Sequence, residues 1–202
     1  MIAVIDYGVG NTQSVLFALQ RLERDAILSS TATELEGAEG LILPGVGAFC
    51  EAMDNLRKND LDTAVREAVR GGIPLLGICL GHQILFSESE EHGLHRGLDL
   101  IEGRVHRFRG RTKVPHMGWN QVTQGPSPLF GDIPDESFFY FAHSYYVEPR
   151  SEQVVIGTTE YGTRFTSAIG TNLIFGTQFH PEKSGPVGLQ LLENFCEICR
   201  ES

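Results

Sequence analysis

The sequence predicts an α/β fold of three layers, a doubly wound and mainly parallel sheet between helices, extended by antiparallel strands. In the first half, short apolar runs alternate with stretches of helical periodicity, as in parallel α/β proteins. From about residue 100, alternating aromatic-rich segments predict antiparallel strands instead. No repeat or linker interrupts the 202 residues, so we expect one domain over residues 1–202.

The elements of the first half follow one another as strands and helices in alternation. The expected strands are apolar runs at residues 3–6, 26–29, 40–43 and 73–76. The expected helices, with apolar residues three or four positions apart and Asn11 as a possible cap for the first, are residues 12–22, 49–56, 61–69 and 80–86. In such folds, sites lie beyond the carboxyl ends of the parallel strands.

The second half is expected to extend this sheet. Its predicted strands are residues 104–108, 119–122, 138–141, 154–159, 163–169 and 173–179. Pro186 stands near the start of a closing helix, where its missing N–H does no harm.

Composition excludes several classes of function. A net charge of −10 argues against general nucleic-acid binding, which relies on Lys and Arg. No apolar run reaches about 18 residues, so no membrane span is expected. The chain begins directly with a strand, without a basic leader, and we expect an intracellular, cytoplasmic protein. The four cysteines do not suggest a disulfide framework.

A basic strip stands out in this acidic chain. It can be a solvated hairpin or a docking surface for an acidic partner. Its members are Arg104, His106, Arg107, Arg109, Arg111 and Lys113.

The most informative segment surrounds Cys79. Apolar residues run into it, a helical stretch leaves it, and Gly77 and Gly81 flank it. Glycines at these positions permit a strained strand-to-helix turn that projects the middle side chain from the end of the sheet. Although a lone buried cysteine is usually structural, this setting predicts a nucleophile.

A base and an orienting carboxylate follow far downstream. His180 and Glu182 come directly after an apolar run, with a proline between them that stiffens the backbone. Thiol, imidazole and carboxylate together make a nucleophilic triad. We therefore predict Cys79, His180 and Glu182 as catalytic residues.

Acyl chemistry also needs donors for an oxyanion. The backbone N–H of Leu80, next to the nucleophile, is one candidate. The turn formed by Gly45, Val46 and Gly47, after a strand expected beside the Cys79 strand, is the second, although the same residues could form a plain tight turn.

These residues resemble the class I glutamine amidotransferases, which share a Gly-x-Cys-x-Gly elbow and a His-Pro-Glu ending. The resemblance covers essentially the whole chain and implies a flavodoxin-like fold. It also implies that the cysteine attacks the side-chain amide of glutamine, ammonia leaves, and water hydrolyses the glutamyl thioester. It implies that Gln83 and the backbone around Gly45, Gly47, Ser144 and Tyr145 bind glutamine, without a metal or other cofactor.

Further segments resemble one branch, the glutaminase subunits of imidazole glycerol phosphate synthase in histidine biosynthesis. They are residues 6–11, 44–48, 115–120 and 180–184. The resemblance implies a heterodimer with a (β/α)8-barrel synthase (cyclase) subunit that uses the ammonia to make imidazole glycerol phosphate and AICAR. The implied docking face includes Asn11, Met117, Trp119 and Lys183.

Other readings stay open at this point. His82 stands where the branch commonly has methionine, and it is a rival base three residues after Cys79. His92 and His95, beside two glutamates, have metal-ligand spacing but also fit an exposed loop. Ser144 lacks an elbow of its own, and the Cys196–Cys199 pair lacks a second pair for zinc. Another class I amidotransferase, a stand-alone cysteine hydrolase and a binding subunit with a vestigial triad are the alternative functions.

Overall fold

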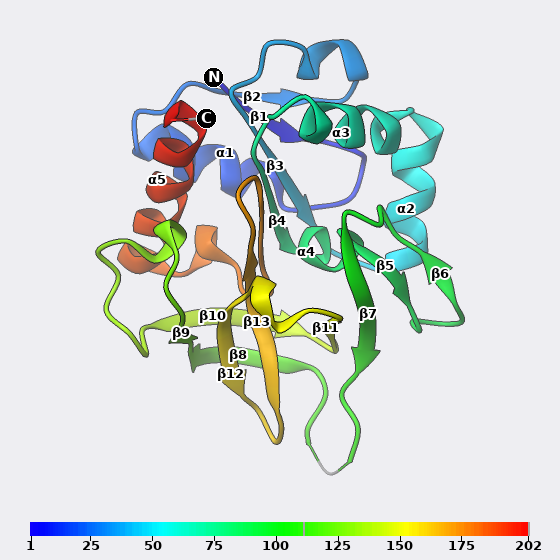
Figure 1. The fold of residues 1–202 in the computed structure, drawn as a ribbon, viewed down its shortest axis with the longest axis vertical. Helices are drawn as coiled ribbons and strands as arrows, with labels where there is room; N and C mark the ends of the chain where they lie inside the picture. The colour runs from blue at the N-terminus through cyan, green and yellow to red at the C-terminus, as the bar shows by residue number, and fades with distance from the viewer. Residues whose placement is uncertain (111, 202) are drawn as a thin grey trace.

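The computed structural model describes residues 1–110 and 112–201 (Figure 1). A large mixed sheet runs through the molecule, and a separate two-stranded sheet lies at one end. The strands are β1 (Ile2–Ile5), β2 (Ala26–Ser29), β3 (Gly40–Gly45), β4 (Leu75–Cys79), β5 (Phe86–Ser89), β6 (His95–Arg96), β7 (Ile101–Arg107), β8 (His116–Gln121), β9 (Thr123–Gln124), β10 (Phe138–His143), β11 (Tyr145–Pro149), β12 (Val155–Glu160), β13 (Arg164–Gly170) and β14 (Ile174–Thr177). The α-helices are α1 (Thr12–Arg21), α2 (Phe49–Lys58), α3 (Leu61–Arg70), α4 (Leu80–Ile84) and α5 (Gly185–Glu201).

The large sheet has a parallel half and a mainly antiparallel half. Strands β2, β1, β3, β4 and β14 are parallel neighbours in that order. The sheet then continues through β13, β11 and β7 in antiparallel pairings. At the far edge β5 pairs parallel to β7 and antiparallel to β6. The predicted fold class is confirmed.

Successive residues of the parallel strands pack into different layers, because side chains alternate across a strand. Val4 and Ile42 belong to the apolar cluster that includes residues of α1 and α5. Ile5 and Leu43, one position later, belong to the cluster that includes residues of α2 and α3. The helices therefore cover both faces of the parallel half (Figure 1). Burial on both faces explains why these strands read as continuous apolar runs.

The small sheet of β8 and β10 keeps one apolar face exposed. Met117, Trp119 and Phe138 are 65%, 56% and 53% exposed. In the antiparallel register Tyr140 pairs with Trp119, and Ala142 pairs with Met117. Alternate residues of the same strands, including His116 and Phe141, point inward and are buried.

Four strands were not predicted, namely β5, β6, β9 and β11, and one predicted helix is shorter than expected. The helix after Cys79 ends at Ile84, because Phe86 begins strand β5. Strand β5 is stabilised by pairing with β7, which is distant in sequence, and a local sequence pattern does not reveal such a pairing. Strand β11 was likewise missed, since its pairing with β7 and β13 is also tertiary. Within residues 1–110 and 112–201, no helix has the length and apolar character needed to cross a membrane.

Several members of the basic strip pair with acidic side chains of this chain. Arg104 forms an ion pair with Glu88. The Arg109 guanidinium lies 3.1 Å from Glu90. His106 lies 3.0 Å from Glu148 and 3.4 Å from Glu90. Arg111 lies outside the described residues. These pairs favour a solvated, internally paired surface over a docking site for an acidic partner.

Candidate active site

Cys79 stands at the turn where β4 ends and α4 begins. Its φ of 57° and ψ of −107° are rare for a residue with a side chain. A Cβ on Gly81 would collide with the Leu43 carbonyl oxygen, and one on Gly77 would lie 2.7 Å from the Gly81 carbonyl oxygen. The two glycines therefore let α4 pack directly against β3 and β4, which is what forces the sharp turn at the cysteine.

The predicted oxyanion turn lies beside this elbow. Gly45 is the register partner of Cys79 between the parallel strands β3 and β4. A Cβ on Gly45 would lie 2.5 Å from the Tyr7 hydroxyl and 2.9 Å from the Gly81 nitrogen. The Tyr7 hydroxyl donates a 2.9 Å hydrogen bond to the Pro44 carbonyl oxygen, and burial raises the pKa of Tyr7, which keeps this donor protonated. Gly47, by contrast, has a φ of +101° and open space around its Cβ position.

His180 and Glu182 form a buried pair after β14. The His180 Nδ1 lies 2.9 Å from Glu182 Oε1, and both side chains are almost completely buried. Burial lowers the pKa of His180, but the charge and hydrogen bonding of Cys79, together with Glu182, outweigh it and raise that pKa well above 6.5. Because Nδ1 is bonded to Glu182, Nε2 is the nitrogen left for the thiol.

Backbone contacts fix where His180 stands. Its N–H donates to the Tyr140 carbonyl oxygen at 2.9 Å. The Ser184 hydroxyl donates to the His180 carbonyl oxygen at 2.6 Å and accepts the Tyr140 N–H at 3.0 Å. The histidine is therefore held between β10 and the turn that precedes α5.

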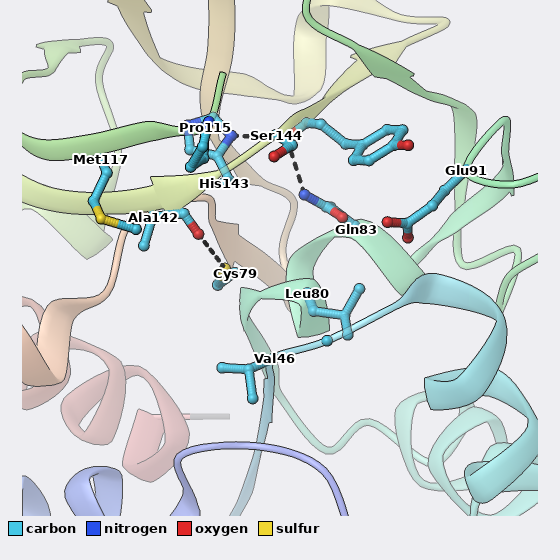
Figure 2. Close-up of a pocket in the computed structure, with 12 residues that line it drawn as sticks. Val46, Cys79, Leu80, Gln83, Glu91, Pro115, Met117, Ala142, His143 and Ser144 are labelled. Carbon is cyan, nitrogen blue, oxygen red and sulfur yellow. Dashed lines mark hydrogen bonds between the residues drawn. The ribbon is translucent and has the colours of Figure 1, made fainter. Parts of the chain in front are cut away.

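A cavity of about 270 Å³ opens beside Cys79 (Figure 2). Its wall combines the elbow, the predicted oxyanion turn and the end of β10. The lining residues are Val46, Gly47, Cys79, Leu80, Gln83, Glu91, Pro115, Met117, Ala142, His143, Ser144 and Tyr145. Most residues predicted for glutamine binding thus surround one space.

Gln178 is a site residue that sequence reasoning missed. Its Nε2 lies 3.8 Å from Cys79 Sγ, and its Oε1 accepts a 2.9 Å hydrogen bond from Gln83 Nε2. Gln83 Nε2 also donates to the Tyr145 carbonyl oxygen at 3.0 Å, which Figure 2 shows. The available signal was a polar residue inside the apolar run 173–179.

Glu91 is a second residue that was not predicted for the pocket. It lines the cavity, and its Oε2 accepts the Phe49 N–H at the start of α2 at 2.7 Å. In the sequence analysis, Glu91 was considered only as a neighbour of His92 and His95, which have the spacing of metal ligands. Among the residues that the structure describes, no three His, Cys, Asp or Glu side chains are grouped to hold a metal ion.

The residues predicted for docking lie at the mouth of the site and beyond it. Met117 lines the cavity, and Trp119 and Lys183 are exposed. Asn11 stands at the N-cap position of α1 but makes no capping hydrogen bond. Its Nδ2 donates to Glu182 Oε1 at 3.4 Å.

His82, the rival base, lies away from the cavity. Its ring is completely buried against Phe86, with both nitrogens unpartnered, and burial lowers its pKa to about 3. Ser144 lines the cavity. Cys196 and Cys199 are buried free thiols, and burial raises their pKa values to about 11 and about 12.

Comparisons with known proteins agree with this geometry. Residues 3–199 match the family profile "Glutamine amidotransferase class-I". The chain is 54% identical over 202 residues to "Imidazole glycerol phosphate synthase subunit HisH" of Moorella thermoacetica, covering 100% of this chain and 96% of that one. The same subunit of Geobacillus kaustophilus is 52% identical, covering 98% and 97%.

Solved structures share the fold at lower identity. A glutamine amidotransferase crystal structure has a TM-score of 0.79 at 20% identity and covers 99% of this chain and 100% of that chain. A chain of PurLQS from Thermotoga maritima has a TM-score of 0.78 at 15% identity, with 97% of each chain covered. The chain therefore belongs to the class I glutamine amidotransferase family and, within it, to the HisH subunits of imidazole glycerol phosphate synthase.

Proposed function

We propose that this chain is the glutamine-hydrolysing subunit of an imidazole glycerol phosphate synthase and delivers ammonia to a synthase subunit for histidine biosynthesis. One observation carries the proposal. An elbow cysteine, a backbone turn rich in glycine and polar pocket residues line one cavity, and an imidazole–carboxylate pair acts on the same thiol.

In the first step the Cys79 sulfur attacks the side-chain amide carbon of glutamine. His180 accepts the thiol proton at Nε2, since Glu182 occupies Nδ1. Glu182 orients the ring and stabilises the imidazolium. The raised pKa of His180 supports this direction of proton transfer.

The oxyanion that forms needs backbone donors in the cavity. The Leu80 N–H, directly after the nucleophile, is one donor. The turn of Gly45, Val46 and Gly47 supplies the second. Apart from Gly47 itself and its two chain neighbours, no atom lies within 4 Å of the Gly47 Cβ position, which leaves room for a peptide rotation. His180 then returns the proton to the departing ammonia. A water molecule, deprotonated by His180, hydrolyses the thioester to glutamate and frees the thiol.

The α-groups of glutamine need charged and polar partners. Glu91 lines the cavity and offers a carboxylate for the α-ammonium group. Gln83 and the backbone at Ser144 and Tyr145 offer hydrogen bonds to the rest of the substrate.

Ammonia released at neutral pH would be protonated in bulk water and lose its nucleophilicity, so the acceptor reaction must take place in a docked partner. The names of the relatives support a second synthase subunit. We assign the partner as a (β/α)8 barrel in a heterodimer, docked on the exposed apolar face at Met117, Trp119 and Phe138 together with Asn11 and Lys183. Exposed tryptophan and other large apolar side chains favour such a contact.

The test is made on the complex with the synthase subunit. Cys79→Ala should abolish synthesis from glutamine but leave synthesis from added ammonium salts unchanged. Cys50→Ala, which removes a free thiol outside the cavity, is the matched control and should keep both activities. Loss of the ammonium-dependent activity in the folded Cys79→Ala complex would contradict the division of labour. Glutamine hydrolysis at full rate without any partner would favour a stand-alone cysteine hydrolase.

A further inference from the structure

A row of three polar side chains, of which His116 and His143 are buried and Asn120 is partly buried, runs from strand β8 to the glutamine cavity. Asn120 Nδ2 lies 3.2 Å from His116 Nε2, and His116 Nδ1 lies 2.9 Å from His143 Nε2. His143 Nδ1 lies 2.7 Å from the Tyr145 carbonyl oxygen, a contact drawn in Figure 2. The mechanism above uses none of these three side chains.

The cavity end of the row fixes the proton positions of both rings. A carbonyl oxygen can only accept, so His143 Nδ1 must carry the hydrogen that reaches Tyr145. In the neutral ring Nε2 is then an acceptor, and His116 must donate to it from Nδ1. His116 Nε2 is left as an acceptor, which requires a donor from Asn120.

The other end imposes the same direction independently. The Asn120 Oδ1 accepts the Gln121 N–H at 2.8 Å, and its Nδ2 donates to the Glu160 carbonyl oxygen at 3.0 Å. If the Asn120 amide were rotated by 180°, its NH2 group would face the Gln121 N–H, and its oxygen would face the Glu160 carbonyl oxygen. The amide nitrogen must therefore face His116, as the cavity end demands.

The surroundings keep both rings neutral. His116 is stacked between Phe141 and Tyr161, with ring centroids 4.6 and 3.9 Å away. The Phe108 ring lies 5.3 Å from that of His143. Burial lowers the pKa of His116 to about 4 and that of His143 to about 3. A proton on either ring would replace an acceptor by a donor and break one bond of the row.

The row ends on the part of the cavity that binds substrate in the proposed function. The Tyr145 carbonyl oxygen accepts from both His143 and Gln83, and Gln83 contacts Gln178 beside the nucleophile. We propose that Asn120, His116 and His143 form a one-way hydrogen-bond relay that fixes the Tyr145 carbonyl, and that they are positioning residues for glutamine binding. The expected effect on glutamine kinetics rests on the proposed glutaminase function. The proposed positions of the protons on the two rings do not depend on that function.

The first arm of the test reads the protons directly. In ¹⁵N-labelled protein at pH 7, NMR should find both His116 and His143 neutral and protonated at Nδ1. This arm requires no activity. An Nε2-protonated tautomer or a charged ring at either position would overturn the relay.

The second arm measures glutamine kinetics in the complex with the synthase subunit. His116→Phe keeps the aromatic stacking but removes the donor to His143 at a position outside the cavity lining. It should raise KM for glutamine about three- to tenfold, the range of one hydrogen bond, with kcat within about twofold. His143→Leu should raise KM at least as much, and His143→Asn, which retains a donor near the Nδ1 position, should recover most of the loss.

The matched control is Asn194→Leu. Asn194 lies on α5, outside the cavity lining, and its Nδ2 donates to the carbonyl oxygens of Leu129 and Gly131. Removing these two hydrogen bonds should leave KM unchanged. An unchanged KM in folded His116→Phe, or an equal rise in Asn194→Leu, would overturn the positioning assignment. A wild-type complex that does not hydrolyse glutamine would refute the proposed function instead, and the tautomers would still decide the relay.

Discussion

Replacing His82 by methionine should stabilise the protein. The His82 ring is 0% exposed, and neither ring nitrogen has a hydrogen-bond partner. A buried polar group without a partner costs about 1–3 kcal/mol, whereas methionine fills a similar volume with apolar atoms. At pH 7.5 we therefore expect His82→Met to raise the free energy of unfolding by about 1–3 kcal/mol.

The gain should grow as the pH falls. Burial lowers the pKa of His82 from its ordinary 6.5 to about 3. Between pH 6.5 and pH 3, His82 therefore binds a proton in the unfolded chain but not in the folded protein. Wild-type stability then falls by about 1.4 kcal/mol per pH unit on account of this ring. At pH 5 the variant should gain roughly 2 kcal/mol more than at pH 7.5. The other buried histidines are present in both proteins, and the charge of His82 is the smallest influence named on the pKa of His143, so their contributions nearly cancel.

The assay is urea unfolding of wild type and variant at pH 7.5 and pH 5. His92→Asn, which removes an exposed histidine and tolerates its φ of 56°, is the control and should show no such pH-dependent gain. A loss of stability in His82→Met, or a gain that is the same at both pH values, would refute the reasoning. Either result would mean that the buried ring has a partner or binds a proton in the folded state.

Glu182→Gln should lower the pKa of His180, because it removes the carboxylate bonded to Nδ1, and should reduce kcat for glutamine by about 100-fold or more. NMR titration of His180 together with steady-state kinetics measures this, and an unchanged pKa would show that Glu182 does not act on the ring. Gly81→Ala should destabilise the fold by about 3 kcal/mol or more, since its Cβ meets backbone, whereas Gly47→Ala should cost only about 1–3 kcal/mol from its positive φ. Urea unfolding compares them, and equal losses would contradict the close-packing argument.

Local sequence patterns predicted the fold class and indicated Cys79, His180 and Glu182 as candidate catalytic residues. The glycines around Cys79 identified the elbow, because the need for glycine at a sharp turn can be read from the residues next to it. In the structure, each glycine permits a close approach of backbone segments. The alternation of apolar runs and helices predicted the parallel half, whose strands are buried on both faces. That His180 acts on Cys79 could be predicted only because a thiol, an imidazole and a carboxylate from distant segments together make a nucleophilic triad.

The residues that were missed depend on contacts that no local pattern encodes. Gln178 lies within an apolar run, and only the neighbouring strands show that it meets Gln83 and Cys79. Glu91 reaches the cavity through the start of α2, more than 40 positions away in sequence. Asn11 was predicted as a possible helix cap, but it makes no capping hydrogen bond, and its Nδ2 donates to Glu182, which lies 171 positions away in sequence.

The most direct test of the proposed chemistry is to trap the covalent intermediate. The complex with the synthase subunit is mixed with glutamine, quenched in acid during turnover, digested and analysed by mass spectrometry. A glutamyl thioester should be found on the peptide that contains Cys79, and it should be absent when Cys79 is replaced by alanine. Formation of glutamate with the adduct on another residue, or without any adduct under conditions that preserve thioesters, would contradict the assignment of Cys79 as the nucleophile.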